Sequence, residues 1–383
     1  MHFLYQSASQ RFNPCVARDI TRYAKRLESQ QFPVIFSLMH LSQITGIEYR
    51  VLHDSVNRKR ESANYKLFAI RKKNGDRRFI HAVNGRLFHL QQYIHRYLLS
   101  KAIPHSSSFA YHSTGGILKC AQAHCGCNWL IKFDLNDFFF SIPENRVFEI
   151  FRRFGYNPLL SFELARLSTT LRLPHSKAGN LQYNAKWRPA QFCDPEHDGD
   201  QFPYHPTRFQ GVLPQGAPTS PQLSNLIAFK MDVELNSLAQ RLGLVYTRYA
   251  DDIAFSSGTN SNFSRIGFIQ KSIRQIIRNN QFLVNEAKTR VSGPGSRKVV
   301  LGFLVDGSHP RLTKAFRHKV DQQIFRIFKF GIADTAKSLG FTSTYGYRNH
   351  LRGLLSFVKS HDPQTWKSIV RKYPALPQLL TSF

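Results

Sequence analysis

Hydrophobic and polar positions follow two different patterns along this chain. In some stretches apolar residues recur every three or four positions, which predicts amphipathic helices; elsewhere, short apolar or aromatic runs bounded by turn residues predict strands. Helices are expected at 87–98, after Pro143, at 221–242 and at 266–279. Strands are expected at 65–70, 78–83, 129–135, 244–248 and 253–257. Helices packed beside a small sheet indicate an α+β architecture.

Composition divides the chain into three regions. Residues 1–64 are basic with apolar residues at helical spacing, residues 65–305 contain the expected strands, and residues 306–383 are helical, basic and aromatic. In the central region, Asn74-Gly75 predicts the turn of a basic hairpin. The stretch 175–208 is polar and rich in proline, histidine and aspartate, so we interpret it as an insertion.

The chain is strongly basic, with 53 lysines and arginines against 24 acidic residues and a formal net charge of +29. Self-repulsion at this charge opposes compaction unless a polyanion is nearby, so nucleic acid is the expected partner. A membrane partner is not expected, because the sequence has no run of about 18 apolar residues and no signal-peptide core. The cysteines are scattered without a disulfide framework, which is consistent with a cytoplasmic location.

Three aspartates carry the candidate chemistry. Asp251 and Asp252 lie between two expected strands, at a hairpin tip, where two unit charges about 4 Å apart repel by roughly 4 kcal/mol at an effective dielectric of about 20. Asp134 lies near the end of another apolar strand. Acids at the ends of neighbouring strands can converge on a pair of Mg²⁺ ions, with the Leu135 carbonyl and substrate phosphates completing the coordination. Asp137 is expected to face solvent or cap a turn.

A loop before the helix at 221–242 lies between these acidic segments in the sequence. It reads Gln215-Gly216-Ala217-Pro218, in which Gly216 allows close approach to a ligand and the proline stiffens the entry to the helix. An ordinary loop-to-helix junction is the alternative interpretation. The position between the acidic segments favours a ligand-binding role.

Together these segments resemble the palm motifs of bacterial reverse transcriptases. The matching stretches are 133–139 (FDLNDFF), 213–221 (LPQGAPTSP) and 249–252 (YADD), while 285–290 (NEAKTR) resembles the next motif and 71–80 the fingers hairpin. The resemblance implies a right-hand polymerase: fingers, a palm with a small antiparallel sheet flanked by helices, and a helical thumb. It also implies an RNA-directed DNA polymerase that uses two Mg²⁺ ions.

The resemblance further implies roles at the catalytic centre. Asp134 and Asp251 would bind both metal ions with the Leu135 carbonyl, and Asp252 would support the site. Phe139 matches the aromatic residue that excludes a ribose 2′-hydroxyl, so deoxynucleotides would be preferred. A core phenylalanine is the alternative interpretation of Phe139.

Other matching residues are expected to bind the nucleotide and the primer. Gln215 and Gly216 would contact the incoming nucleotide and its template base. Lys72 and Arg78 would hold its β- and γ-phosphates, since cations neutralise charge on the leaving pyrophosphate. An exposed basic turn is the alternative, and Lys73 could replace Lys72.

Two further residues complete the expected site. Lys288 matches a lysine proposed to protonate pyrophosphate, although a solvated surface lysine is an equally ordinary interpretation. Tyr249 would pack near the primer terminus.

Within this class the chain is most similar to retron reverse transcriptases. Cys120-Ala121-Gln122-Ala123-His124 stands where that family has Asn-Ala-x-x-His, and Val300-Leu301-Gly302 stands where it has Val-Thr-Gly. The resemblance implies that His124, Val300 and Gly302 help to recognise a cognate structured noncoding RNA. The enzyme would prime from a guanosine 2′-hydroxyl and make a branched RNA–DNA hybrid (msDNA), in anti-phage defence with a separate effector protein. The alternatives are an abortive-infection type of reverse transcriptase and a non-catalytic RNA-binding subunit.

Overall fold

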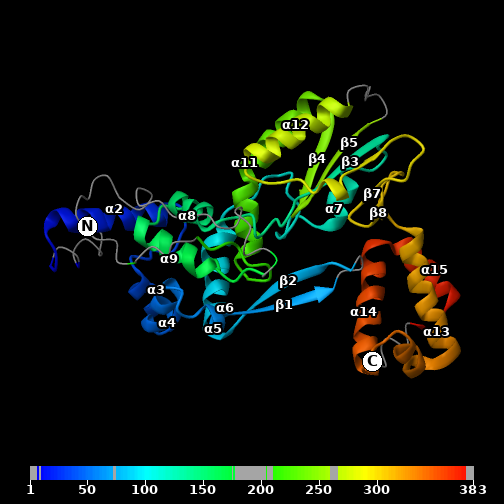
Figure 1. The fold of residues 1–383 in the computed structure, drawn as a ribbon, viewed down its shortest axis with the longest axis horizontal. Helices are drawn as coiled ribbons and strands as arrows, with labels where there is room; N and C mark the ends of the chain where they lie inside the picture. Colours follow the sequence, from blue (N-terminus) through cyan, green and yellow to red (C-terminus); the bar gives the residue numbers. More distant parts are fainter. Residues whose placement is uncertain are drawn as a thin grey trace.

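The computed structural model describes residues 7, 10–71, 75–174, 176, 204, 210–258 and 266–376. The molecule is elongated, with the N-terminal helices at one end, a sheet flanked by helices in the middle and a helical region at the other end (Figure 1). This arrangement is α+β, as the hydrophobic pattern predicts. In the described part of the chain, no helix is long and apolar enough to cross a lipid bilayer.

Short helices form the N-terminal end. They are α2 (Pro14–Ser29), α3 (Leu38–Thr45), α4 (Tyr49–Val56) and α5 (Glu61–Asn64). The side chain of Ser37 caps the first turn of α3, and Gly46 ends that helix in the left-handed conformation at φ 67°. The buried faces of these helices join the same hydrophobic cluster as the central sheet, so this region is packed onto the rest of the protein.

The expected basic hairpin follows. Strands β1 (Tyr65–Arg71) and β2 (Arg77–Val83) are antiparallel, in a register that runs from Tyr65 opposite Val83 to Arg71 opposite Arg77. The base of the hairpin is anchored by Tyr65 and His81, which are buried, whereas its outer half is largely exposed. The hairpin extends beneath the central sheet toward the C-terminal helices (Figure 1).

Helices connect the hairpin to the central sheet. They are α6 (Gly85–Tyr93), which continues as a π-helical turn η1 (Ile94–Leu98) and a 3₁₀ turn η2 (Leu99–Lys101), then α7 (Ile117–Gln122), α8 (Glu144–Arg153) and α9 (Pro158–Ser168). The predicted helix at 87–98 is therefore helical throughout, but its last turn widens. Helices α8 and α9 pack against each other, and α9 also packs against α4 and α6.

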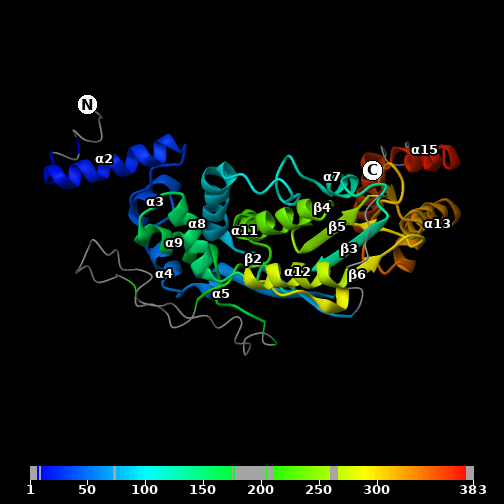
Figure 2. The ribbon, with the colours of Figure 1, turned by 90° about the horizontal axis from the view of Figure 1, so that it is seen from above.

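The central sheet has the strand order β4-β5-β3-β6 with antiparallel pairing. Its strands are β3 (Trp129–Asp134), β4 (Leu244–Tyr249), β5 (Asp252–Ser257) and β6 (Arg290–Ser292). Helices α11 (Ser220–Arg241) and α12 (Ile266–Asn279) cover one face, where Phe133 and Phe255 are buried. The opposite face holds Leu130 and Ala254 against α7. Figure 2 shows the sheet between α7 and α12.

The C-terminal region begins with a small sheet and continues as helices. Its elements are β7 (Val299–Val300), β8 (Phe303–Leu304), β9 (Arg311–Leu312), α13 (Lys314–Ser338), α14 (Thr344–His361) and α15 (Pro363–Lys372). Gly331 interrupts α13 with a non-helical conformation at φ 79°. Buried residues of these helices share a second hydrophobic cluster with α7 and the outer face of the central sheet.

Candidate active site

The three predicted acids meet at one end of the central sheet. In the β3–β5 ladder Asp134 lies directly opposite Asp252. The Leu135 amide donates a hydrogen bond to the Asp251 carbonyl at 3.0 Å, which ties the end of β3 to the hairpin tip. Ala250 adopts φ 57° to make the tight turn between β4 and β5. Residues directly opposite in an antiparallel pair project to the same face, so the carboxylates of Asp134 and Asp252 are neighbours.

This proximity changes the acidity of the carboxyl groups. Burial, followed by the charge of Asp134, raises the pKa of Asp251 above its usual range. Burial and the charge of Asp251 raise the pKa of Asp252 to about 6. Each group is harder to ionise because it is buried and because a neighbouring carboxylate is negative. A bound cation would relieve this repulsion.

Lys288 supplies positive charge to the group. Its ammonium donates to both carboxylate oxygens of Asp134, at 2.9 and 2.8 Å. Burial alone would lower the pKa of Lys288, but the hydrogen bonds and charge of Asp134 outweigh it and raise that pKa. Asn285 adds two bonds to Asp134, one from its amide nitrogen to the backbone carbonyl at 2.7 Å and one from its side chain to the carboxylate at 3.2 Å. The segment with η5 (Glu286–Lys288) is thus fixed against β3.

The donor atoms here suit a hard divalent cation. Within the described ranges, no three histidine, cysteine or acidic side chains gather closely enough to hold an ion by themselves. A magnesium site does not need such a cluster, because it keeps several waters and uses one or two carboxylates with substrate phosphates. The oxygens of Asp134, Asp251 and Asp252, with the Leu135 carbonyl, fit that requirement, and the raised pKa values of Asp251 and Asp252 indicate negative charge that needs neutralisation.

A cleft of about 770 Å³ opens beside the acids. The sequence-predicted residues that line it are Arg78, Asp134, Leu135, Phe139, Gln215, Asp251 and Lys288. Asp137 also lines the cleft, with φ 48°, although the sequence had suggested a solvent-facing or capping role. Lys72 lies outside the described residues. Segments far apart in the sequence therefore form one cavity with acidic, basic and aromatic walls.

Gly216 makes a close contact with β2. Its φ is 114°, and a Cβ at this position would lie 2.8 Å from the His81 carbonyl. The His81 amide also donates to the Gln215 carbonyl at 2.8 Å. Close approach at Gly216 is therefore to the backbone of β2, and it fixes the neighbouring Gln215 in the wall of the cleft.

Tyr249 and Asp252 lie behind the main cleft. They line a small cavity together with Lys132, Cys120 and Thr247, on the α7 side of the sheet. Tyr249 is half-buried and packs against both hydrophobic clusters. Asp252 is thus a neighbour of the Asp251 carboxylate without forming part of the cleft wall.

His124, which is expected to help recognise RNA, lies inside the protein and not on its surface. Its side chain is only 1% exposed, and its ring nitrogens lie 2.6 Å from the Ser256 hydroxyl and 2.7 Å from the Thr247 hydroxyl. Burial lowers the pKa of His124 to about 4, so the ring is neutral at physiological pH. Because both ring nitrogens are used inside the protein, His124 fastens the end of α7 to the sheet and has no surface for direct RNA contact.

The Val300-Leu301-Gly302 segment ends β7 and makes the turn into β8. Leu301 and Gly302 have φ 49° and 88°, and they connect β7 to β8. Val300 is 2% exposed and belongs to the second hydrophobic cluster, so it too is excluded from direct RNA contact. Gly302 could contact RNA only through the backbone of the turn.

Sequence reasoning missed a buried ion pair beneath the hairpin of β4 and β5. Arg248 and Asp232 are both fully buried, and the guanidinium donates to the two carboxylate oxygens at 2.7 and 2.6 Å. The same guanidinium donates to the carbonyl of Ala250 at 3.2 Å, in the hairpin tip. Tyr246 donates to Asp232 at 2.6 Å. The available signal was a single arginine in the otherwise uncharged run of β4.

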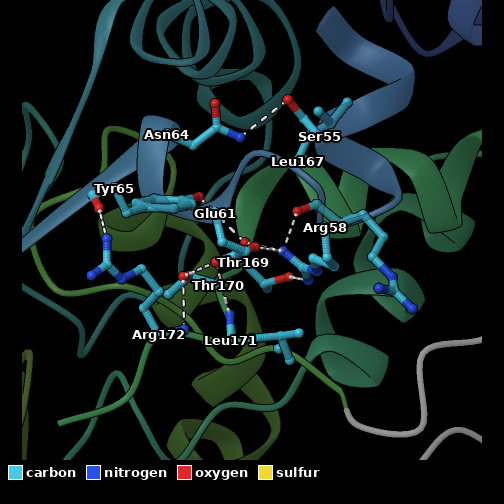
Figure 3. A network of polar contacts seen from close by, with 12 residues as sticks. Ser55, Arg58, Glu61, Asn64, Tyr65, Leu167, Thr169, Thr170, Leu171 and Arg172 are labelled. Carbon is cyan, nitrogen blue, oxygen red and sulfur yellow. Dashed lines mark hydrogen bonds and ion pairs between the residues drawn. The ribbon is translucent and has the colours of Figure 1, made fainter.

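A second buried network connects the N-terminal helices to the base of the β1–β2 hairpin (Figure 3). Arg58 donates to Glu61 at 2.9 Å and also bonds the buried Glu144. Glu61 accepts from the Thr170 hydroxyl at 2.6 Å, and Arg172 donates to the Tyr65 carbonyl at 2.7 Å. The network joins α5, the end of α9 and the first residue of β1, so it fixes the hairpin where it leaves the core.

Comparisons with known proteins agree with this geometry. The family model described as reverse transcriptase (RNA-dependent DNA polymerase) matches residues 70–342. The retron Ec86 reverse transcriptase of Escherichia coli is 27% identical over 347 residues, which cover 90% of this chain and 91% of that protein. The retron Mx65 reverse transcriptase of Myxococcus xanthus is 29% identical over 365 residues, covering 93% of this chain and 75% of that protein.

Among solved structures, a foamy viral protease-reverse transcriptase in complex with double-stranded DNA matches with a TM-score of 0.38 and 16% identity. The match covers 82% of this chain and 39% of that one, so the chain spans less than half of that protein. The family match confirms the right-hand polymerase fold expected from the motifs, which has fingers, a palm with a small antiparallel sheet flanked by helices, and a helical thumb. This chain belongs to the reverse transcriptase family, and its relatives place it among the bacterial retron-type enzymes.

Proposed function

We propose that this enzyme copies RNA into DNA by two-metal nucleotidyl transfer, as a retron-type reverse transcriptase. The observation that carries the proposal is the placement of Asp134 opposite Asp252, with Asp251 bonded to the end of β3. These acids lie at the edge of a cleft that the cationic side chains of Arg78 and Lys288 also line. A non-catalytic RNA-binding subunit would have no need to maintain mutually repelling carboxylates. The arrangement favours the polymerase over that alternative.

The acidic residues would hold the metal ions. Asp134, Asp251 and Asp252, with the Leu135 carbonyl, would bind two Mg²⁺ ions. When bound, such a pair lowers the pKa of an attacking hydroxyl and stabilises the leaving oxygen. Lys288 occupies the flank of Asp134, where its ammonium can donate a proton to pyrophosphate.

Other residues of the cleft would bind the nucleotide. Arg78, with Lys72, would hold the β- and γ-phosphates, because fixed cations stabilise charge that develops on a leaving group. Phe139 would block a ribose 2′-hydroxyl. Gln215, fixed by the contact of its neighbour Gly216 with β2, would meet the nascent base pair. Tyr249 would pack near the primer terminus.

The substrate would be a structured noncoding RNA. The net charge of +29 supports a polyanion partner, and the thumb helix α13 exposes Phe325 (50%), Phe328 (42%) and Phe330 (54%) among lysines and arginines. Phosphate contacts on such a surface give affinity without sequence information. By analogy with the retron relatives, we propose priming from a guanosine 2′-hydroxyl, a branched RNA–DNA product (msDNA) and a role in cytoplasmic anti-phage defence with an effector protein.

Primer extension on an RNA template tests the proposal. Wild-type protein should incorporate deoxynucleotides with Mg²⁺, and both EDTA and Asp251→Asn should reduce incorporation at least about a thousandfold. The control variant is Asp19→Asn, which changes an exposed carboxylate on α2. No incorporation by folded wild-type protein would support the non-catalytic alternative.

Sequencing of the nucleic acid that co-purifies with the protein separates the subtypes. A retron enzyme should carry covalently joined RNA and DNA, which the Asp251→Asn variant should lack. Polymerase activity without any joined RNA and DNA would instead indicate another bacterial defence reverse transcriptase.

A further inference from the structure

Tyr111 lies in the catalytic cleft without any assigned role. It lines the cleft beside Asp251 and Arg78. Its ring centroid is 6.3 Å from that of Phe139 and 6.4 Å from that of Tyr249. The ring therefore stands between the residue expected to meet the nucleotide sugar and the residue expected near the primer terminus.

The backbone of Tyr111 is strained. Its φ of 67° lies in the left-handed region, which bulky side chains rarely adopt. Such a conformation costs on the order of 1–3 kcal/mol and persists only where the surroundings enforce it, most often at functional sites. An ordinary loop would relax, so the strain at Tyr111 requires specific restraints.

Those restraints are hydrogen bonds to Arg248 in β4 and to Asn225 in α11. The Phe109 amide donates to the Arg248 carbonyl at 2.8 Å, and the Arg248 amide donates to the Ser107 carbonyl at 2.8 Å. The side chain of Asn225 donates to the Ala110 carbonyl at 2.8 Å. The segment that carries Tyr111 is thus bonded to β4, the strand that leads into the turn with Asp251, and this fixes the position of the segment relative to that turn.

The Tyr111 hydroxyl is available to a ligand. It makes no hydrogen bond with any of the residues that the structure describes, and Tyr111 is 41% exposed and lines the cleft. Burial of the hydroxyl and the charge of Asp251 raise the pKa of Tyr111 to about 12, so the group is a hydrogen-bond donor at physiological pH.

We propose that Tyr111 contacts the incoming deoxynucleoside triphosphate, with its ring against the sugar beside Phe139 and its hydroxyl donating to a sugar or phosphate oxygen. The inference rests on the proposed polymerase function and adds a residue to its nucleotide site. The aromatic pair of Tyr111 and Phe139 would then set the width of the sugar pocket. Discrimination against ribonucleotides would depend on both rings.

Single-nucleotide incorporation by the full-length protein tests this role. Tyr111→Phe removes one hydrogen bond and should raise the KM for the deoxynucleotide about fivefold with kcat nearly unchanged. Tyr111→Ala should raise it further and should reduce the preference for deoxy- over ribonucleotides about tenfold or more. The matched controls are Tyr97→Phe and Tyr97→Ala, since Tyr97 is 42% exposed on η1 outside the cleft, and both should behave as wild type.

A glycine variant separates the role of the ring from folding. Tyr111→Gly removes the ring where glycine adopts φ 67° without strain, so the protein should stay folded by thermal melting and still show the raised KM. Unchanged KM and unchanged sugar preference in all three variants would overturn the inference, and so would weaker primer–template binding with an unchanged KM. If wild-type protein incorporates nothing, the proposed function itself fails.

Discussion

The buried pair of Arg248 and Asp232 offers the sharpest test of what fixes the turn between β4 and β5. Both side chains are 0% exposed, and the guanidinium also bonds the carbonyl of Ala250, the residue directly before Asp251. Removing one partner of a buried pair leaves an uncompensated charge and costs about 3–5 kcal/mol. This is a large fraction of the roughly 5–15 kcal/mol that stabilises a typical domain.

Asp232→Asn should therefore lower the free energy of unfolding by about 3–5 kcal/mol. Urea unfolding followed by tryptophan fluorescence measures this, because Trp129 lies in β3 of the palm. The double variant Arg248→Met/Asp232→Leu removes both charges and should cost less than the sum of the two single variants, with a coupling free energy of about 2 kcal/mol or more.

Catalysis should respond differently from stability. Arg248→Lys keeps the charge but cannot reproduce the planar fork that reaches Asp232 and Ala250 together. We expect Arg248→Lys to lower kcat at least about tenfold, because small displacements of catalytic groups reduce the rate. The double variant should be folded but should also have a reduced kcat. The control is Arg22→Lys in an exposed ion pair with Asp19. Single variants at Arg248 and Asp232 with near wild-type stability and kcat would refute the reasoning.

Two further predictions concern charge and packing. The folded-state pKa of Asp252 is raised to about 6, so between about pH 4 and 6 the native state binds more protons than the unfolded state. The stability without divalent cations should therefore fall as the pH rises through that window. Melting temperatures in EDTA should show this slope in the wild type and a smaller slope in Asp252→Asn, in which Asp251 still has a raised pKa. Gly211→Ala would place a Cβ 2.5 Å from Arg58 and 2.7 Å from Glu144, so it should lower the melting temperature. The control is Gly267→Ala in α12, which has open space around it and should leave the melting temperature unchanged. Equal melting temperatures for the two variants would contradict the close packing at Gly211.

Much of the palm follows from the sequence because its strands are short apolar runs with defined ends. The acids Asp134 and Asp252 end or begin such runs, and antiparallel pairing then brings them together. The alternation of side chains along a strand does not show which neighbouring residues face one another when the register of pairing is unknown. His124 belongs to a motif that is expected to help recognise RNA, yet it is buried against Thr247 and Ser256 on neighbouring strands.

The contacts of loop residues were the part of the site that the sequence predicted least well. Tyr111 reaches the cleft only because Asn225 and the backbone of Arg248 hold its segment, and such tertiary contacts leave no periodic pattern in the chain. Gly216 was recognised as a point of close approach, but the partner, the carbonyl of His81, depends on where the hairpin lies. The apolar run 299–304 gave no indication that Leu301 and Gly302 would turn it back on itself.

The attachment of β2 at His81 determines how the fingers can move. The His81 amide is bonded to Gln215, and its ring nitrogen donates to the Arg172 carbonyl at 2.7 Å, so this point of the strand is a fixed pivot. Arg78 lies three residues further out, about 10 Å along an extended strand. Bending the outer hairpin by about 20° about that pivot would swing the guanidinium through roughly 3–4 Å, from the lever length alone. Movement of Arg78 would then need only bending of the outer hairpin, while Gln215 stays bonded to His81.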